Sequence, residues 1–127
     1  IVLPEGLKRI GDGYQSYSND GAFYGCTSLK SVTFPTTLEY IGCYAFFACS
    51  SLKEIEINSV TIGSNAFSSC SSLKRVKINS GLSYIGGHAF AYCNRLKEVI
   101  LPNTLTNCDA GAFRGCTALE EITLPQE

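Results

Sequence analysis

Apolar and polar residues alternate along the chain in a block that recurs at a fixed spacing. Residues 73–95, LKRVKINSGLSYIGGHAFAYCNR, are repeated with small changes before and after this block, with a period of 23 residues and one copy of 21. A unit this short cannot close a hydrophobic core, so it must bury its apolar face against its neighbours. The sequence therefore predicts one stacked array, 1–127. Its units lie at about 1–28, 29–51, 52–72, 73–95 and 96–118, with a partial copy at 119–127.

The first part of each unit, with consensus LKxVxL, has the period of two that is typical of a half-buried strand. Proline often follows it directly, where the strand ladder has ended and a missing N–H does no harm. Successive copies run in the same direction, so they should pair as one parallel sheet, roughly 25 Å wide at ~4.8 Å per strand. The predicted strands are 30–34, 53–57, 74–78, 97–101 and 120–124.

The second part of each unit, IGxxAFxxC, spaces Ala, Phe and Cys for about one helical turn that faces inward. A glycine before this turn, at 42, 63 and 86, permits the chain to reverse. The expected fold class is thus an α/β solenoid, with a parallel sheet on one side and short helical turns on the other. The phenylalanines predicted to lie inside are Phe23, Phe46, Phe67, Phe90 and Phe113.

The two ends of the chain depart from the pattern. The first unit carries eight extra residues, since Ile10 and Phe23 are thirteen apart where Ile41 and Phe46 are five apart. The inserted stretch, 11–21, is rich in Gly and Asn-Asp turn formers, which predicts an exposed loop. Neither end shows a polar capping unit, so we expect a fragment of a longer array that can associate end to end.

Five of the seven cysteines occupy the same repeat position: Cys26, Cys49, Cys70, Cys93 and Cys116. They could form a disulfide ladder, a metal site or a column of buried thiols. Equivalent atoms in stacked units lie ~4.8 Å apart with parallel side chains, whereas a disulfide needs Cβ atoms ~3.8 Å apart and turned toward each other. A linear column also cannot surround zinc tetrahedrally. We therefore predict free, buried thiols, and we interpret Cys108 as a small hydrophobe in place of Ile.

The copy LKEVILPNTLTNCDAGAFRGCTA and its sister copies resemble the BspA-like, or Treponema pallidum-type, leucine-rich repeats. The resemblance rests on the 23-residue period, Pro after the strand, IGxxAF, and Cys three residues after Phe. It implies a right-handed superhelix with the sheet on the concave side and short helical turns on the convex side. Departures are the 21-residue unit, Asn58 and Asn79 in place of Pro, and Asp109 in place of Gly.

Members of this family are typically bacterial or protozoan surface proteins. The resemblance therefore implies a cell-surface or secreted protein that adheres to host or neighbouring-cell proteins. It supplies no catalytic residues and no cofactor that could be assigned to this sequence.

Charge and candidate chemistry narrow the functions further. Lys and Arg total 10 against 11 for Asp and Glu, so no bulk basic surface favours nucleic acid. The sequence has no run of 18 apolar residues that would predict a membrane span, and no export signal opens it.

His88, the only histidine, lacks a nucleophile and an orienting acid at a helpful spacing, and we expect it to be exposed. Asp12 and Asp20 lack the alternating oxygen ligands of a calcium loop. We expect no enzyme, no metal and no cofactor.

Two surfaces are candidates for binding a protein. On the exposed strand positions, charges alternate between neighbouring units, so opposite charges can pair. This alternation is either self-compensation in a solvated sheet or a docking face with Arg75 and Lys77 at its centre. The face comprises Glu54, Glu56, Arg75, Lys77, Glu98 and Ile100, the last a rare exposed apolar group.

The second candidate surface is the inserted loop, where Tyr14 and Tyr17 offer contact area at low entropic cost. Tyr24, Tyr40 and Tyr84 could add to it, although aromatic cover over a loop explains them equally well. The leading hypothesis is a protein-binding module, and the alternative is a structural spacer with no ligand of its own. The partner's identity does not follow from the sequence.

Overall fold

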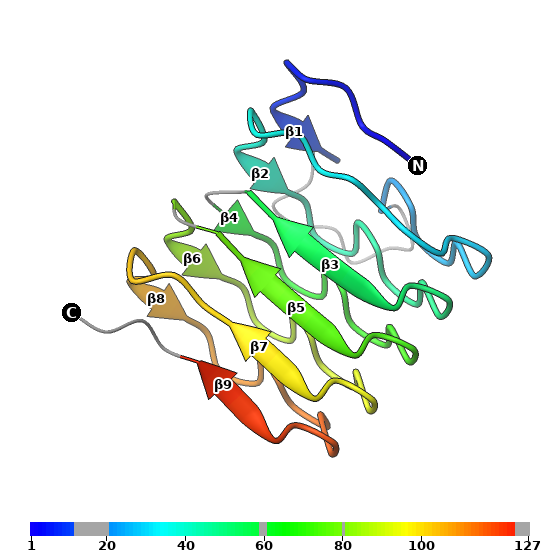
Figure 1. The fold of residues 1–127 in the computed structure, drawn as a ribbon, viewed down its shortest axis with the longest axis vertical. Helices are drawn as coiled ribbons and strands as arrows, with labels where there is room; N and C mark the ends of the chain where they lie inside the picture. The colour runs from blue at the N-terminus through cyan, green and yellow to red at the C-terminus, as the bar shows by residue number, and fades with distance from the viewer. Residues whose placement is uncertain (12–20, 59–60, 80, 124–127) are drawn as a thin grey trace.

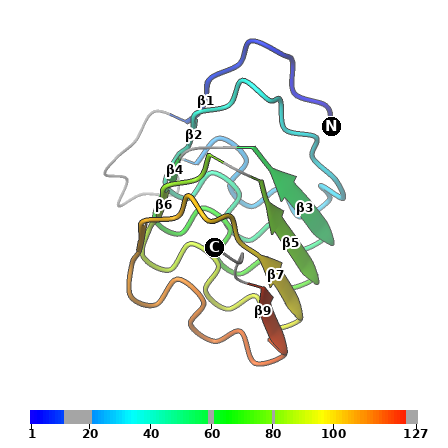
Figure 2. The same ribbon diagram turned by 60° about the vertical axis from the view of Figure 1, so that its left-hand side comes forward.

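The computed structural model describes residues 1–11, 21–58, 61–79 and 81–123, without the side chains of 121 and 123. The chain forms a stack of coils, and each repeat lies against the one before it (Figure 1). Within the described ranges every regular element is a β-strand. The strands form two parallel sheets, which lie on different sides of the stack (Figure 2).

The larger strands form one sheet in the order β3-β5-β7-β9. Glu54, Arg75, Glu98 and Glu121 are aligned across it. This confirms four of the five predicted strands and their register. The predicted strand at 30–34 is the exception, because its only bridge joins Thr33 to Val2. The observed bounds are β3 (Glu54–Ile57), β5 (Arg75–Ile78), β7 (Glu98–Ile100) and β9 (Glu121–Thr123).

A second sheet of two-residue strands was not predicted, and the expectation of one sheet was wrong. Its order is β1-β2-β4-β6-β8, all parallel. Glycine follows the first four of these strands, and after β2, β4 and β6 the neighbouring backbones approach too closely for a side chain: a Cβ on Gly86 would lie 2.6 Å from Ser64 N. The strands are β1 (Arg9–Ile10), β2 (Tyr40–Ile41), β4 (Thr61–Ile62), β6 (Tyr84–Ile85) and β8 (Asn107–Cys108).

The predicted helical turns are also wrong. In each of the four units between 29 and 118, two residues that are four positions apart have left-handed backbone angles, as at Tyr44 and Ala48, both with φ of 59°. A right-handed helical turn needs negative φ at every residue, so it cannot run through these positions. The backbone instead bonds to the next unit: Phe46 N–H donates to Ala66 O at 2.7 Å, and Phe67 N–H donates to Ala89 O at 2.7 Å. The turns therefore form a third set of hydrogen bonds between units.

The phenylalanine column lies inside, as predicted. Phe46, Phe67 and Phe90 are completely buried, and Phe23 and Phe113 at the two ends are half-buried. Consecutive rings stack almost parallel, with centroids 4.9 to 5.5 Å apart. This spacing is within the range of favourable aromatic pairs. The column thus connects every unit to the next through the core.

The cysteine column lies beside the phenylalanines. Cys49 Sγ donates to Phe23 O at 3.2 Å, and the equivalent bonds of Cys70, Cys93 and Cys116 are 3.1 to 3.2 Å. All seven thiols are free, and Cys49, Cys70 and Cys93 are buried, which confirms the predicted column at those positions. Burial raises the pKa of Cys49 and of Cys116 to about 11.

Cys108 departs from the prediction. It was expected to replace a core Ile, but it is exposed: it lies in β8, the last strand of its sheet in chain order, and no later described strand pairs with β8. The equivalent Ile10, Ile41, Ile62 and Ile85 are buried.

The buried thiols predict a loss of stability at alkaline pH. The folded state favours the neutral thiol of Cys49, whose pKa rises from 9.0 to about 11. Its contribution is therefore complete below pH 9.0 and is lost as the pH rises toward 11. Urea unfolding across this window should show a falling free energy of unfolding, with a shallower fall in Cys49→Ala. Equal slopes in the two proteins would mean that this thiol is not held neutral by burial.

Candidate functional site

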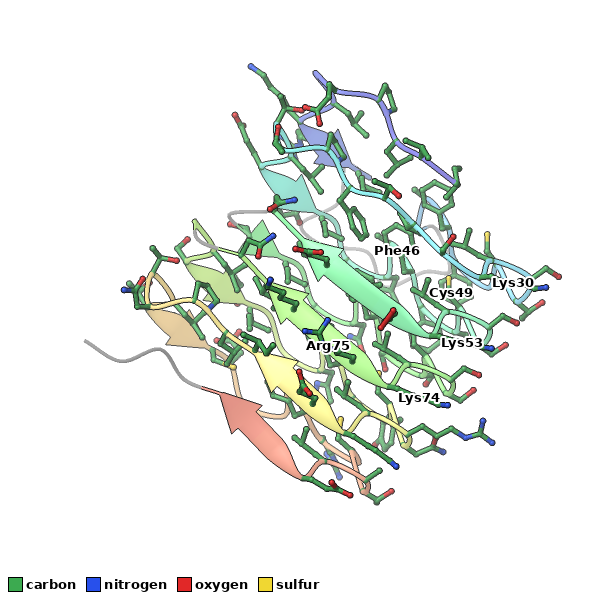
Figure 3. The ribbon with its side chains drawn as sticks, viewed as in Figure 1. Lys30, Phe46, Cys49, Lys53, Lys74 and Arg75 are labelled. Atoms are coloured by element: carbon green, nitrogen blue, oxygen red, sulfur yellow. The ribbon has the colours of Figure 1, made fainter. Side chains whose placement is uncertain are left out.

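The exposed face of the larger sheet brings together the charged residues predicted to form the docking surface. Side chains alternate along each strand, so Ile55 and Val76 are buried while their neighbours point outward. Figure 3 shows Arg75 on this outer face. Glu54 and Glu56 are exposed, and Arg75, Lys77, Glu98 and Ile100 are partly exposed. We call these six residues the sheet face.

Opposite charges on the sheet face pair across neighbouring strands. Arg75 Nε donates to Glu98 Oε1 at 3.0 Å, and Lys77 Nζ lies 3.8 Å from Glu56 Oε1. Arg75 lies in register with Glu54 as well, but its hydrogen bond goes to Glu98. Both pairs are exposed to solvent and contribute only ~0–1 kcal/mol each. An incoming charged group can therefore replace a partner at little cost.

Ile100 lies beside Lys77 in register, on the outer side of β7. It is half-buried, so it is less exposed than the sequence predicted. It still places an apolar side chain next to the two ion pairs.

Asparagines border one end of the sheet face. Asn79 Nδ2 donates to Asn58 Oδ1 at 2.7 Å and to Glu56 Oε1 at 3.2 Å. The Asn79 N–H also donates to Ile57 O at 2.9 Å, a bond that proline could not make. The replacement of Pro by Asn in these two units thus extends the ladder between them. The sequence showed the substitution but not this role.

Lysines border the other end, where the strands begin (Figure 3). Lys53 and Lys74 are on adjacent units, since Lys74 N–H donates to Lys53 O at 2.7 Å. Among the described residues, no carboxylate lies within salt-bridge distance of this row. Like charges on neighbouring strands repel one another, so this border keeps a positive potential. The row comprises Lys30, Lys53, Lys74 and Lys97, all exposed.

A hollow of about 490 Å³ opens on the sheet face beside β3. Sequence reasoning did not find it, because it depends on the missing pairing of segment 31–34. Its lining residues are Ser31, Val32, Thr33, Phe34, Glu54, Ile55, Glu56, Asn58 and Arg75.

The inserted loop is the second predicted surface. Tyr14, Tyr17, Asp12 and Asp20 lie outside the described residues. A few residues after the insertion in the sequence, Tyr24 stacks on Phe47 with ring centroids 4.9 Å apart, and the Tyr44 centroid is 5.4 Å from that of Phe47. These rings pack on one another, which supports aromatic cover as the role of Tyr24.

The other two tyrosines are occupied by contacts within the array. Tyr40 is buried under the Arg9 guanidinium, which lies 5.1 Å from the ring centroid. Tyr84 donates a hydrogen bond from its hydroxyl to Asp109. This hydrogen bond is the main cause of the raised pKa of Tyr84, and burial is the second. Neither is placed as a free binding anchor.

The structure places His88 differently from the sequence-based prediction. His88 has φ of 60° and is half-buried, not exposed, because its ring lies against Gly111 of the next unit. No group of three or more His, Cys, Asp or Glu side chains among the described residues is arranged to hold a metal ion. The same residues contain no helix that is long and apolar enough to cross a bilayer.

The parallel strands, stacked phenylalanines and repeated turns define a leucine-rich repeat array. The sequence matches the model of the BspA type leucine rich repeat region in six copies over residues 16–127. The chain belongs to this family. A comparison with curated proteins finds no match.

Two solved structures are similar to this chain over most of its length. The Treponema pallidum leucine-rich repeat protein is 34% identical to this chain, with a TM-score of 0.86. The match covers 98% of this chain and 58% of the Treponema pallidum chain. A leucine-rich cell surface protein from Faecalibacterium prausnitzii is 33% identical, with a TM-score of 0.83. This match covers 96% of this chain and 31% of the Faecalibacterium chain. The chain thus spans only part of either relative.

Proposed function

We propose that this chain is a protein-binding module of a cell-surface or secreted protein and that its partner docks on the sheet face. The observation that carries the proposal is the pair of exposed, weakly held ion pairs, Arg75–Glu98 and Lys77–Glu56, beside Ile100 on one rigid sheet. The similarity to a leucine-rich cell surface protein supports the location. The proposal includes no catalytic reaction and no cofactor.

The physical argument rests on the small cost of opening these ion pairs. An acidic group of the partner that approaches Arg75 or Lys77 exchanges one exposed ion pair for another, now partly shielded from water. Ile100 supplies apolar area beside the charges, where contact with a partner removes it from solvent. Binding energy at such a face is expected to be concentrated in Arg75 and its immediate neighbours.

The alternative is a structural spacer that holds another domain away from the surface. The charge pairing on the sheet face favours this alternative, because compensated charges need no partner. A spacer requires only that the stack be stable, so its sheet face should be indifferent to charge reversal. Adhesion requires a partner whose affinity depends on that face.

Reversing both central charges, Arg75→Glu with Lys77→Glu, should weaken partner binding at least about tenfold and change its salt dependence. Binding is measured against a panel of purified extracellular-matrix and cell-surface proteins. Arg95→Glu with Arg114→Glu is the matched control, since it makes the same charge change at exposed positions outside the strands.

Unchanged affinity after the central reversals, together with loss of binding on deletion of residues 14–19, would place the site on the inserted loop and overturn the proposal. Binding to no member of the panel would favour the spacer. Circular dichroism of each variant verifies that the fold is retained.

A further inference from the structure

The ladder of the larger sheet is interrupted between the second and third units. Segment 31–34 bonds toward the N-terminus, since Leu3 N–H donates to Thr33 O at 3.0 Å and Thr33 N–H donates to Ile1 O at 2.9 Å. Within the described ranges, no backbone hydrogen bond joins this segment to β3. Figure 1 shows the segment in cyan beside the first green strand, β3.

The two units are joined normally elsewhere. Gly63 N–H donates to Ile41 O at 2.8 Å in the second sheet, and the bond from Phe46 to Ala66 joins the turns. The interruption is therefore confined to the strand side. It coincides with the step from a 23-residue unit to the 21-residue unit at 52–72.

The register shows which N–H and C=O groups of β3 lack a hydrogen-bond partner in the preceding unit. Glu98 N–H donates to Lys74 O at 3.3 Å, and Asn79 N–H donates to Ile57 O at 2.9 Å. The backbone groups of Glu98 and Asn79 therefore point toward the preceding unit. The equivalent positions in the third unit are Glu54 and Asn58, and Glu56 lies between them with the same orientation, because alternate residues of a strand point to the same side.

The facing segment has the complementary arrangement. Thr33 directs its N–H and C=O toward Leu3 and Ile1. By the same alternation, Val32 and Phe34 direct their N–H and C=O groups toward β3. Two rows of donors and acceptors therefore face each other with no direct bond between them. We call the space between these rows the slot.

The slot is the hollow of about 490 Å³, a size typical of binding pockets. Val32, Phe34 and Ile55 line it and are buried, which gives it an apolar floor. Glu54 and Glu56 lie at its exposed rim. Arg75 also lines the hollow, but its guanidinium pairs with Glu98, and Lys77 lies 3.8 Å from Glu56. Glu54 forms no ion pair with a described residue. Glu54 is thus the carboxylate at the rim that is free to pair with a basic group.

We propose that the slot binds an extended peptide segment of a protein partner, in which apolar and basic residues alternate. The segment lies as an added strand between residues 31–34 and β3, bonding to both rows of backbone groups. Its apolar side chains pack on Phe34 and Ile55, and its basic side chains pair with Glu54 and Glu56. This inference deepens the proposed function, since the slot opens on the same sheet face.

The probe is a blocked hexapeptide of alternating valine and lysine. It should bind and should protect the Glu54 and Glu56 amides from hydrogen exchange, measured by NMR on the full chain. In the free protein those two amides should exchange faster than the Arg75 and Lys77 amides, which point toward β3 within the paired ladder.

Glu54→Gln with Glu56→Gln should weaken binding of the valine–lysine peptide about tenfold at low ionic strength. Glu39→Gln with Glu120→Gln, two exposed carboxylates outside the slot, is the matched control.

Two further peptides separate the added strand from simple charge attraction. N-methylation of alternate residues removes backbone donors without changing charge, and it should weaken binding about tenfold or more. A valine–glutamate peptide should not bind measurably. Equal binding of the methylated peptide, equal binding of the acidic peptide, or slow exchange of Glu54 and Glu56 in the free protein would each overturn the inference.

The variant Arg75→Glu with Lys77→Glu distinguishes this inference from the proposed function. It replaces Arg75, which lines the slot, and Lys77 by acidic side chains. It should therefore strengthen binding of the valine–lysine peptide while it weakens binding of the panel protein. If only the peptide result fails, the slot is wrong and the sheet face stands. If only the panel result fails, the slot stands and the proposed docking face is wrong.

Discussion

Phe67→Ala should lower the free energy of unfolding by ~3–5 kcal/mol, the usual cost of truncating a buried phenylalanine. The Phe67 ring is completely buried, and it stacks on Phe46 at 5.1 Å and on Phe90 at 5.3 Å. Its removal leaves a cavity in the middle of the array and breaks two stacking contacts at once. The chain on either side is then joined only by backbone ladders and smaller side chains.

Urea unfolding followed by circular dichroism measures this cost, with the slope in denaturant compared between variants to verify that the same surface unfolds. Tyr92→Ala is the control, because it truncates an aromatic ring that is 50% exposed and should cost far less. A cost below about 1 kcal/mol for Phe67→Ala would mean that the inward face has been assigned wrongly.

Gly86→Ala should destabilise the fold by about 1–3 kcal/mol or more, as overpacking does. The added Cβ would lie 2.6 Å from Ser64 N and 2.9 Å from Gly63 C. Both are backbone atoms of the preceding unit, so they cannot move aside as a flexible side chain would. The two units would have to separate at the second sheet.

The neighbouring Gly87→Ala is a closely matched control. Its Cβ would meet nothing nearer than Ala110 O at 3.7 Å, and its φ lies outside the left-handed region. We therefore expect no loss, or a gain of about 0.4–1 kcal/mol from a less flexible unfolded chain. Equal thermal midpoints for the two variants would contradict the close approach of the backbones at Gly86.

Much of the fold could be predicted from the repeat itself. A recurring position has similar surroundings in the interior units of a stack, so the burial of Phe67 predicts that of Phe46 and Phe90. The strand register follows for the same reason, which is why Arg75 was correctly placed between Glu54 and Glu98. These predictions needed no knowledge of the backbone angles.

The backbone of the turns could not be predicted in the same way. The sequence AFxxC has helical spacing, but Tyr44, Asn65 and His88 carry ordinary side chains at left-handed angles, which few residues adopt. A signal was present in the unit at 96–118, where Gly111 and Gly115 occupy the two left-handed positions. Two-residue strands such as Tyr40–Ile41 are likewise too short for a hydrophobic period to identify.

The candidate site was predicted in its residues but not in its shape. Alternation along the strands gave the exposed columns, because every second strand residue must face outward. The slot arises from an absence of pairing between 31–34 and β3, and the repeat pattern predicts pairing there. A periodic sequence does not show between which two units the strand pairing is missing.

Hydrogen exchange of the chain with and without a bound panel protein tests the central claim most directly. If the sheet face is the docking surface, the partner should slow exchange in β3, β5 and β7 and leave the inserted loop at 11–21 unchanged. Slower exchange confined to that loop, with the three strands unaffected, would contradict the claim.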